Sequence, residues 1–184
     1  MSSIRPLIVF VDGQYRVDPD TAEWLSKRTE PFGVLACAGK FRTGKSFLMN
    51  RLLNLPPGRG FGVGDTVQAC TRGIWVCTEF LSINGMDVLV LDTEGIDALD
   101  AENDHDVRIF ALGILMCTAM AYNSMSHLDE AAVQSLSLMT RIADAVGGGT
   151  HTPSLYWVLR DFTLQLVDGD GRGITHSEYL EQAL

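Results

Sequence analysis

Hydrophobic residues near the start of the chain form two short runs separated by a polar break. Residues 7–11 and 14–17 flank Asp12-Gly13, a pair that favours a two-residue β-hairpin turn. Asp18 or Asp20 then precedes apolar residues at helical spacing, so we expect a short capped helix. The pattern therefore predicts two paired strands followed by a helix.

A continuous apolar run at residues 32–39 is typical of a buried parallel strand, and it ends in glycine. Beyond a short polar loop, helical spacing begins and lasts as far as Pro56-Pro57. The apolar residues at that spacing are Phe47, Leu48, Leu52 and Leu55. Strand, glycine-containing loop and helix thus follow one another in that order.

The middle of the chain predicts further strands. Residues 74–83 and 86–92 have strand composition and are joined by Asn84-Gly85, a second hairpin signal. Residues 58–73 are rich in glycine and lack periodicity, which predicts a long mobile loop. Residues 109–122 are apolar throughout, and we interpret them as a central strand.

The last third alternates helix and strand. Apolar residues repeat on one face of residues 128–146, which predicts a helix with Ser126 and Asp129 as its capping box. Residues 154–159 predict a strand. Thr175 and Glu178 form the capping-box pattern of a final helix.

These elements predict an α/β fold. We expect the three-layer sandwich of a P-loop NTPase, with a mostly parallel sheet and one antiparallel hairpin. At 184 residues, with 46% apolar and 20% charged residues, the chain fits one globular domain covering residues 1–184.

Charge and cysteine content exclude several classes of function. The net charge of −9 repels polyanions, so we expect no nucleic-acid partner. Four cysteines show no metal spacing, which favours reduced thiols. We find no signal peptide, and the longest apolar run is shorter than the roughly 20 residues of a membrane span. We therefore expect a cytoplasmic protein without a membrane anchor in this chain.

The loop after the first buried strand carries the strongest chemical signal. Residues 39–46 read GKFRTGKS and match the phosphate-loop pattern G-x-x-x-x-G-K-[ST]. Gly39 and Gly44 let consecutive backbone N–H groups face inward, where the helix N-terminus adds positive charge. In this pattern Lys45 contacts the β- and γ-phosphates of a nucleotide and Ser46 contacts Mg²⁺. The motif also contains a second cation, Arg42.

Two further polar clusters follow predicted strands. Asp92-Thr93-Glu94-Gly95 fits a Mg²⁺-binding aspartate and a glycine N–H for the γ-phosphate, although such residues also form ordinary turns. After the strand at residues 154–159 comes Arg160-Asp161. The Asp161 carboxylate is either a guanine reader, accepting two N–H groups that adenine lacks, or a simple cap. Residues 168–171 lack the glutamate of a calcium loop and predict a turn.

In order along the chain, these segments resemble the N-terminal GTPase domain of guanylate-binding proteins and atlastins, in the dynamin superfamily. The resemblance rests on GKFRTGKSFLMNRLL, GVGDTVQACTRGIW, LVLDTEG, IFALGILMCTAMAYNS, VLRDF and EYLEQAL, and extends from Pro6 to the end of the sequence. It implies Mg²⁺-dependent hydrolysis of GTP to GDP and phosphate.

The resemblance also implies roles for individual residues. Arg42 would act in cis as an arginine finger, although a salt bridge to the acidic residues 97–106 remains an alternative. Thr71 would supply a second hydroxyl to Mg²⁺ and a carbonyl near the attacking water, and Glu94 would orient that water indirectly. The implied metal ligands are Ser46, Thr71 and Asp92. The implied nucleotide-binding residues are Gly39, Lys40, Phe41, Arg42, Thr43, Gly44, Lys45, Ser46, Phe47, Gly95, Arg160 and Asp161.

The sequence departs from the family in two ways. Ala69 replaces a serine that often helps to position water in the family. The family's domain also continues beyond this chain, so we expect the last strand, the base-covering segment and the helical stalk to be absent. These departures leave open a GTP-sensing module with weak or no turnover, and a nucleotide-dependent homodimer. A kinase sharing the same loop is a third reading, but the sequence shows neither a lid nor a second substrate pocket.

Overall fold

A computed structural model of the chain describes residues 3–56, 58–63, 73–94, 104–126 and 153–183, with residues 133, 134, 137, 138, 140, 141 and 145. The described strands are β1 (Ile4–Val11), β2 (Gln14–Val17), β3 (Gly33–Ala38), β4 (Ile74–Cys77), β5 (Leu81–Ile83), β6 (Met86–Thr93), β7 (Ala119–Met125) and β8 (Ser154–Arg160). The described helices are α1 (Pro19–Ser26), α2 (Lys45–Leu52), α3 (Asp104–Met116) and α5 (His176–Ala183).

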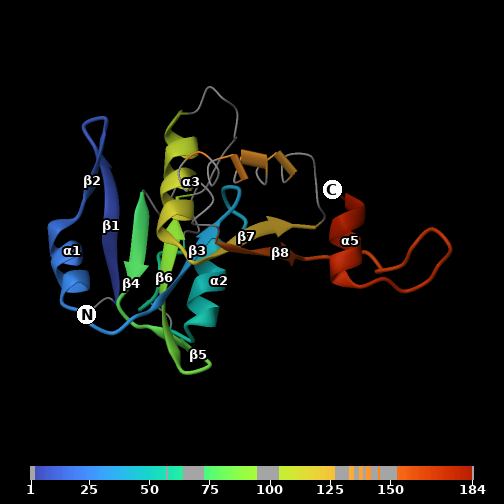
Figure 1. Ribbon diagram of the computed structural model, residues 1–184, viewed down its shortest axis with the longest axis horizontal. Helices are drawn as coiled ribbons and strands as arrows, with labels where there is room; N and C mark the ends of the chain where they lie inside the picture. Colours follow the sequence, from blue (N-terminus) through green and yellow to red (C-terminus); the bar gives the residue numbers. More distant parts are fainter. Residues whose placement is uncertain are drawn as a thin grey trace.

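The strands form one mixed sheet in the order β2-β1-β4-β6-β3-β7-β8, and β5 pairs with β6 (Figure 1). Neighbours among β6, β3, β7 and β8 are parallel, whereas β1, β2, β4 and β5 pair antiparallel. The predicted α/β fold with a parallel central sheet is confirmed. Its antiparallel part is larger than the single predicted hairpin, because β1 and β2 join the same sheet through β4, and β4 and β5 both pair with β6.

The side chains of the central strands alternate between two hydrophobic cores, as the pleat of a sheet requires. Ala36 and Ala38 of β3 belong to a core that also contains Ile109 and Phe110 of α3, with Trp24 of α1 packed against it. The intervening Cys37 belongs to the other core, together with Met49 of α2. Helices therefore cover both faces of the sheet, in three layers.

Several local predictions are confirmed. Asp12-Gly13 and Asn84-Gly85 have positive φ at both positions and close two-residue hairpins. Asp18 caps α1 by accepting a hydrogen bond from the Thr21 N–H at 2.9 Å. At the last helix, the Thr175 N–H donates to the Glu178 carboxylate at 2.6 Å, as the capping box predicts.

The interpretation of residues 109–122 as one strand is wrong. Their first part belongs to helix α3, and the strand β7 begins only at Ala119. An apolar run of this kind does not distinguish a buried helix from a buried strand by periodicity. The exposed side chains show the helical period of α3: Arg108 and Leu115 both face solvent, and they are seven residues, or about two helical turns, apart.

The helix predicted at residues 128–146 falls largely outside the described residues, as does Asp129 of its predicted capping box. Those positions within it that are described are helical. Near the end of the chain, the N–H groups of Asp170 and Arg172 donate to the Asp168 carboxylate at 3.0 and 2.8 Å, which confirms the predicted turn. In the described part of the chain, no helix is long and apolar enough to cross a membrane.

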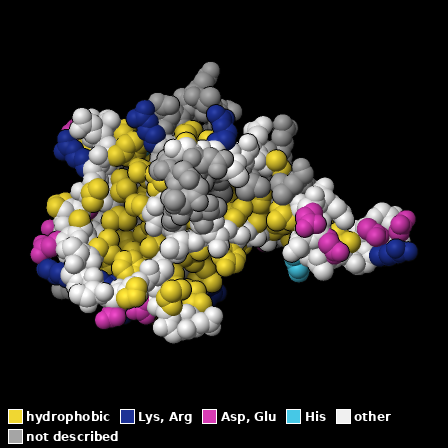
Figure 2. All heavy atoms as spheres, in the orientation of Figure 1, with side chains coloured by type: hydrophobic (Ala, Val, Ile, Leu, Met, Phe, Trp, Pro, Cys, Tyr) yellow, Lys and Arg dark blue, Asp and Glu magenta, His cyan; other side chains and the backbone are white. Residues whose placement is uncertain are grey.

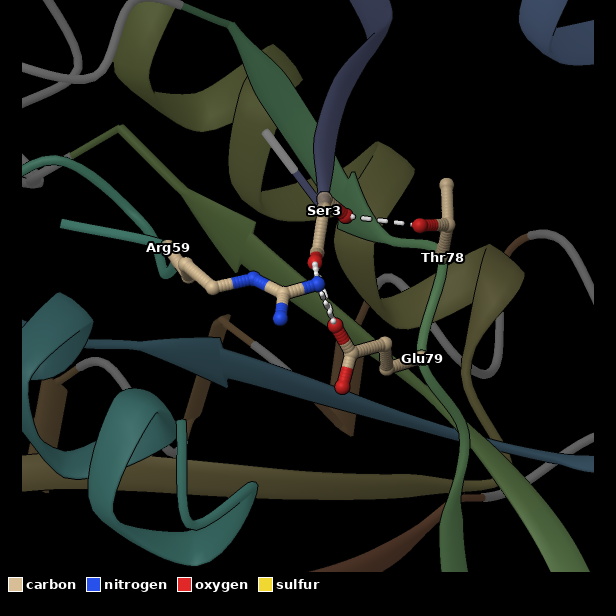
Figure 3. Close-up of polar contacts among 4 residues, drawn as sticks. All are labelled: Ser3, Arg59, Thr78 and Glu79. Atoms are coloured by element: carbon tan, nitrogen blue, oxygen red, sulfur yellow. Dashed lines mark hydrogen bonds and ion pairs between the residues drawn. The ribbon is translucent and has the colours of Figure 1, made fainter. Parts of the chain in front are cut away.

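At the end of the sheet where β6 begins, polar contacts tie the first described residues to two other segments (Figure 3). The Thr78 hydroxyl donates to the Ser3 carbonyl at 3.0 Å. The Arg59 guanidinium lies 3.2 Å from the Glu79 carboxylate, which also accepts from the Ser3 hydroxyl.

Figure 2 shows hydrophobic side chains gathered between α1 and α3, with charged side chains mainly around them.

Candidate functional site

The carboxyl ends of β3, β6, β7 and β8 meet at one edge of the sheet because these strands run parallel. Each strand brings a polar group to this edge: the phosphate-loop sequence follows β3, Asp92 and Asn123 lie near the ends of β6 and β7, and Arg160 ends β8. In open α/β sheets, ligands bind at this edge.

Two glycines give the loop between β3 and α2 its shape. Gly39 has φ +143°, and a Cβ atom there would lie 2.1 Å from the carbonyl oxygen of Asn123. Gly44 has φ +82°, and a Cβ atom there would lie 2.5 Å from Nη1 of Arg160. At Gly39 the backbone of Asn123 leaves no room for a side chain, whereas at Gly44 a side chain would have to displace the Arg160 guanidinium and adopt a left-handed conformation.

Donors inside the loop converge on the carbonyl oxygen of Lys40. It accepts from the Lys45 ammonium at 3.0 Å and from the Thr43 hydroxyl at 2.9 Å. The Lys45 residue is only 6% exposed. Burial lowers the pKa of Lys45 from its ordinary value, while the charge of Asp92 acts in the opposite direction. The structure thus holds a largely buried cation beneath the loop.

Ser46 and Asp92 meet at the base of the loop. The Ser46 hydroxyl donates to Oδ2 of Asp92 at 2.6 Å, and Asp92 is fully buried. Hydroxyl and carboxylate oxygens are the hard donors that Mg²⁺ prefers. This donor set fits Mg²⁺, and the structure brings together these two of the three predicted metal ligands.

Asn123 is a site residue that the sequence analysis missed. Its side-chain amide donates to the carbonyl oxygen of Thr43 at 2.8 Å, and the residue is fully buried. Its own backbone carbonyl is the atom that faces Gly39. Asn123 therefore supports the loop from β7 at two points. A polar amide within an apolar strand was the signal available in the sequence.

Arg160 connects the predicted base-reading segment to the phosphate loop. Its guanidinium donates to the Gly44 carbonyl at 3.3 Å and lies 5.3 Å from the ring centre of Phe47. Asp161 follows with φ +53° and is exposed. The Arg160 side chain thereby links the end of β8 to the first turn of α2.

The other predicted loop residues lie at its outer side. Lys40 and Arg42 are exposed, and Phe41 is half-buried. Arg42 has φ +62°, and its guanidinium lies 5.6 Å from the ring centre of Phe41. The loop thus presents the second cation at its surface, while Lys45 lies beneath.

Glu94 makes reciprocal contacts with Gly73. The Glu94 N–H donates to the Gly73 carbonyl at 2.9 Å, and the Gly73 N–H donates to Oε2 of Glu94 at 2.9 Å. The same Oε2 atom lies 3.1 Å from Nε2 of His105. Sequence reasoning did not find the contact with His105, since α3 was not predicted.

The remaining predicted site residues, Thr71 and Gly95, lie outside the described residues, as does Ala69. The acidic residues 97–106, proposed as alternative partners of Arg42, also lie largely outside them.

Comparison with known proteins gives a consistent family match. A family model described as "Guanylate-binding protein, N-terminal domain" matches residues 12–184. Guanylate-binding protein 5 of Homo sapiens is 36% identical, covering 100% of this chain and 34% of the relative. Guanylate-binding protein 1 of Chlorocebus aethiops is 36% identical, covering 97% of this chain and 32% of the relative. The chain spans about a third of the length of these relatives.

Among solved structures, the chain is similar to the G domain of the FeoB iron transporter from T. maritima. The TM-score is 0.43 at 18% identity, covering 70% of this chain and 72% of that one.

Proposed function

This chain belongs to the guanylate-binding protein family, and we propose that it binds GTP with Mg²⁺ and hydrolyses it to GDP and phosphate. The observation that carries the proposal is the loop between Gly39 and Gly44, folded over Lys45, a residue that is only 6% exposed. A cation buried to this degree is stabilised by an anion, and inward-facing amides at a helix N-terminus suit a phosphate group.

On binding, the Lys45 ammonium exchanges the Lys40 carbonyl, now 3.0 Å away, for phosphate oxygens. The backbone amides of the loop and the N-terminus of α2 contribute further partial positive charge. These local groups allow phosphate binding by a chain whose net charge is −9.

Ser46 and Asp92 are the described residues that would hold Mg²⁺, and Thr71 is the third ligand proposed from the sequence. Bound Mg²⁺ would neutralise charge on the β- and γ-phosphates. The hydrogen bond between Ser46 and Asp92, 2.6 Å long, keeps the two oxygen donors together at the base of the loop.

In the proposed reaction, water attacks the γ-phosphorus in line, and the bond from that phosphorus to the bridging oxygen breaks. Arg42 stabilises the negative charge that develops on the leaving oxygens. Thr71 and Glu94 position the water. At the other end of the nucleotide, Asp161 accepts two hydrogen bonds from guanine, with Arg160 holding this segment against the loop through the Gly44 carbonyl.

The test compares phosphate release and GTP affinity in the parent, in Arg42→Ala and in Arg172→Ala. Arg172 lies in the exposed turn after β8, so its variant controls for the loss of one positive charge. We expect Arg42→Ala to lower kcat by about 10³–10⁵, as arginine fingers do elsewhere, while GTP binding persists.

Each outcome separates the alternatives. Failure of the parent to bind GTP overturns the proposal. Tight binding without turnover leaves only a GTP-sensing module. Equal competition by ATP removes the role proposed for Asp161, because adenine lacks the paired donors.

A further inference from the structure

We propose that His105 and Tyr15 are positioning residues for Glu94, holding its carboxylate in place for hydrolysis. The inference rests on the proposed function and adds two residues to it. His105 lies on α3 and Tyr15 on β2, at the edge of the sheet, so side chains from two separate elements support one carboxylate.

Two donors hold the carboxylate itself. Oε2 of Glu94 lies 2.9 Å from the Gly73 nitrogen and 3.1 Å from Nε2 of His105. The Glu94 side chain is 19% exposed and that of His105 28% exposed, so neither moves freely in solvent. The carboxylate therefore depends on His105 for one of its two described donors.

The imidazole ring is in turn fixed on several sides. The Tyr15 hydroxyl lies 2.8 Å from Nδ1 of His105 and 3.2 Å from its backbone carbonyl oxygen. The Tyr15 ring stacks on the imidazole at 5.6 Å between ring centres, and the Phe10 ring meets it edge-on at 4.7 Å. Such packing restricts the ring to one orientation.

Hydrogen-bond chemistry decides which atoms donate and which accept between Tyr15, His105 and Glu94. A carboxylate is an acceptor, so Nε2 of His105 must carry the hydrogen that points to Glu94. In the neutral ring, Nδ1 then accepts from the Tyr15 hydroxyl. In the charged ring, Nδ1 donates to the Tyr15 oxygen, and the Tyr15 hydroxyl turns to the His105 carbonyl. Tyr15 thus supports Nε2–H donation in both protonation states.

The position of Glu94 matters for two reasons. It follows the proposed metal ligand Asp92 by two residues, and it fixes Gly73, which follows the proposed catalytic residue Thr71 by two residues. Catalysis is sensitive to small displacements, and an error of about 1 Å can cost about 10²-fold in rate. Loosening Glu94 would therefore slow the reaction more than it weakens GTP binding.

The first experiment monitors the contact between the Gly73 amide and the Glu94 carboxylate, and it needs no measurement of GTP hydrolysis. The Gly73 amide resonance of the full chain, and its hydrogen exchange, are compared between the parent and His105→Ala, His105→Gln and Tyr15→Phe. We expect a shifted, less protected Gly73 amide in His105→Ala. His105→Gln retains an N–H donor and should restore much of the parent signal. His176→Ala and Tyr156→Phe alter exposed residues and serve as controls.

The second experiment measures GTP turnover in the same variants. We expect His105→Ala to lower kcat about 10- to 100-fold with little change in KM, and His105→Gln to recover part of the loss. Tyr15→Phe should lower kcat in the parent and have no further effect in a His105→Ala background, since its influence passes through the imidazole.

The two readouts separate this inference from the proposed function. An unchanged Gly73 amide in His105→Ala overturns the inference, as does an unchanged kcat in an active protein. A parent that binds GTP without hydrolysing it removes the proposed reaction. In that case the Gly73 amide resonance and its hydrogen exchange still test whether His105 and Tyr15 hold the Glu94 carboxylate in place.

Discussion

The Ser46 hydroxyl lies 2.6 Å from Oδ2 of Asp92, joining the first turn of α2 to the end of β6. The two residues are far apart in the sequence and meet because β3, which precedes the loop, pairs with β6 so that Cys37 lies beside Asp92. The hydrogen bond thus marks where the loop, the helix and the neighbouring strand come together.

Removing the hydroxyl at this contact should weaken the affinity of the protein for Mg²⁺. Loss of a group that merely orients a metal ligand costs about 10–100-fold in metal affinity, so loss of a direct ligand should cost at least as much. We therefore expect Ser46→Ala to need at least about 10-fold more Mg²⁺ for half-maximal GTP binding.

Titration of GTP binding with Mg²⁺ measures this effect, and Ser46→Thr is the matched control because it keeps the hydroxyl. Equal Mg²⁺ requirements for the parent and Ser46→Ala would contradict the metal role of Ser46.

The buried ammonium of Lys45 predicts an effect of pH on stability. Burial lowers its pKa below the ordinary value of 10.5, so the folded protein binds fewer protons than the unfolded chain between the two pKa values. The free energy of unfolding of the nucleotide-free protein should therefore rise with pH through this window. The same contribution is lost as pH falls through the folded pKa.

Chemical denaturation of the parent and of Lys45→Met across alkaline pH isolates this contribution, since methionine does not titrate. The stability of the parent relative to the variant should increase as pH rises towards 10.5. A constant difference between the two curves would show that the ammonium is not perturbed by burial.

Triphosphate affinity should change with pH in the opposite direction. A triphosphate binds the charged ammonium, so GTP binding should weaken as pH rises through the lowered pKa of Lys45. Measured Kd values for the parent and Lys45→Arg test this, because a guanidinium keeps its charge throughout the range. Equal pH dependence in both proteins would assign the effect to another group.

Gly73 and Gly85 form a matched pair for testing backbone crowding. Both have φ +80°. A Cβ atom added to Gly73 would lie 2.1 Å from the Ile8 carbonyl oxygen, whereas a Cβ atom added to Gly85 would have no neighbouring atom within 4 Å. Alanine at Gly85 should cost about 1–2 kcal/mol for its left-handed conformation. Gly73→Ala should lower the free energy of unfolding by about 1–3 kcal/mol more, because its Cβ atom would overlap the Ile8 carbonyl oxygen.

Thermal unfolding measures this difference, which corresponds to about 2–4 °C in Tm per kcal/mol for a chain of this size. Equal Tm losses in the two variants would show that β1 moves away from Gly73 without cost. Gly73→Ala should also slow GTP turnover, since Glu94 contacts both the N–H and the carbonyl of Gly73.

Asn123→Asp tests support of the phosphate loop from β7. The carboxylate has nearly the shape of the amide, but it cannot donate to the Thr43 carbonyl, which now accepts at 2.8 Å. We expect a loss of about 1–3 kcal/mol in stability and weaker GTP binding, because the new charge also repels phosphate. Denaturation and Kd measurements check both effects, and parent-like values would show that the loop holds its shape unaided.

Much of the fold and site could be predicted where short segments carry the information. Asp12-Gly13 and Asn84-Gly85 closed the predicted hairpins because positive φ is a local steric property. The loop from Gly39 to Ser46 could be recognised because its glycines and Lys45 act over a few consecutive residues. The helix at Asp104–Met116 could not, because an apolar run buried on most sides has no clear period.

The sequence by itself determined the phosphate loop, its following helix, the hairpin turns and the strand-end position of Asp92, since backbone sterics and neighbouring side chains decide these. Only the tertiary structure brought Asn123 beneath Thr43, and joined Tyr15, His105 and Glu94 in one chain of hydrogen bonds. These contacts depend on strand order and on how α3 packs against the sheet, which are set by burial of the whole core.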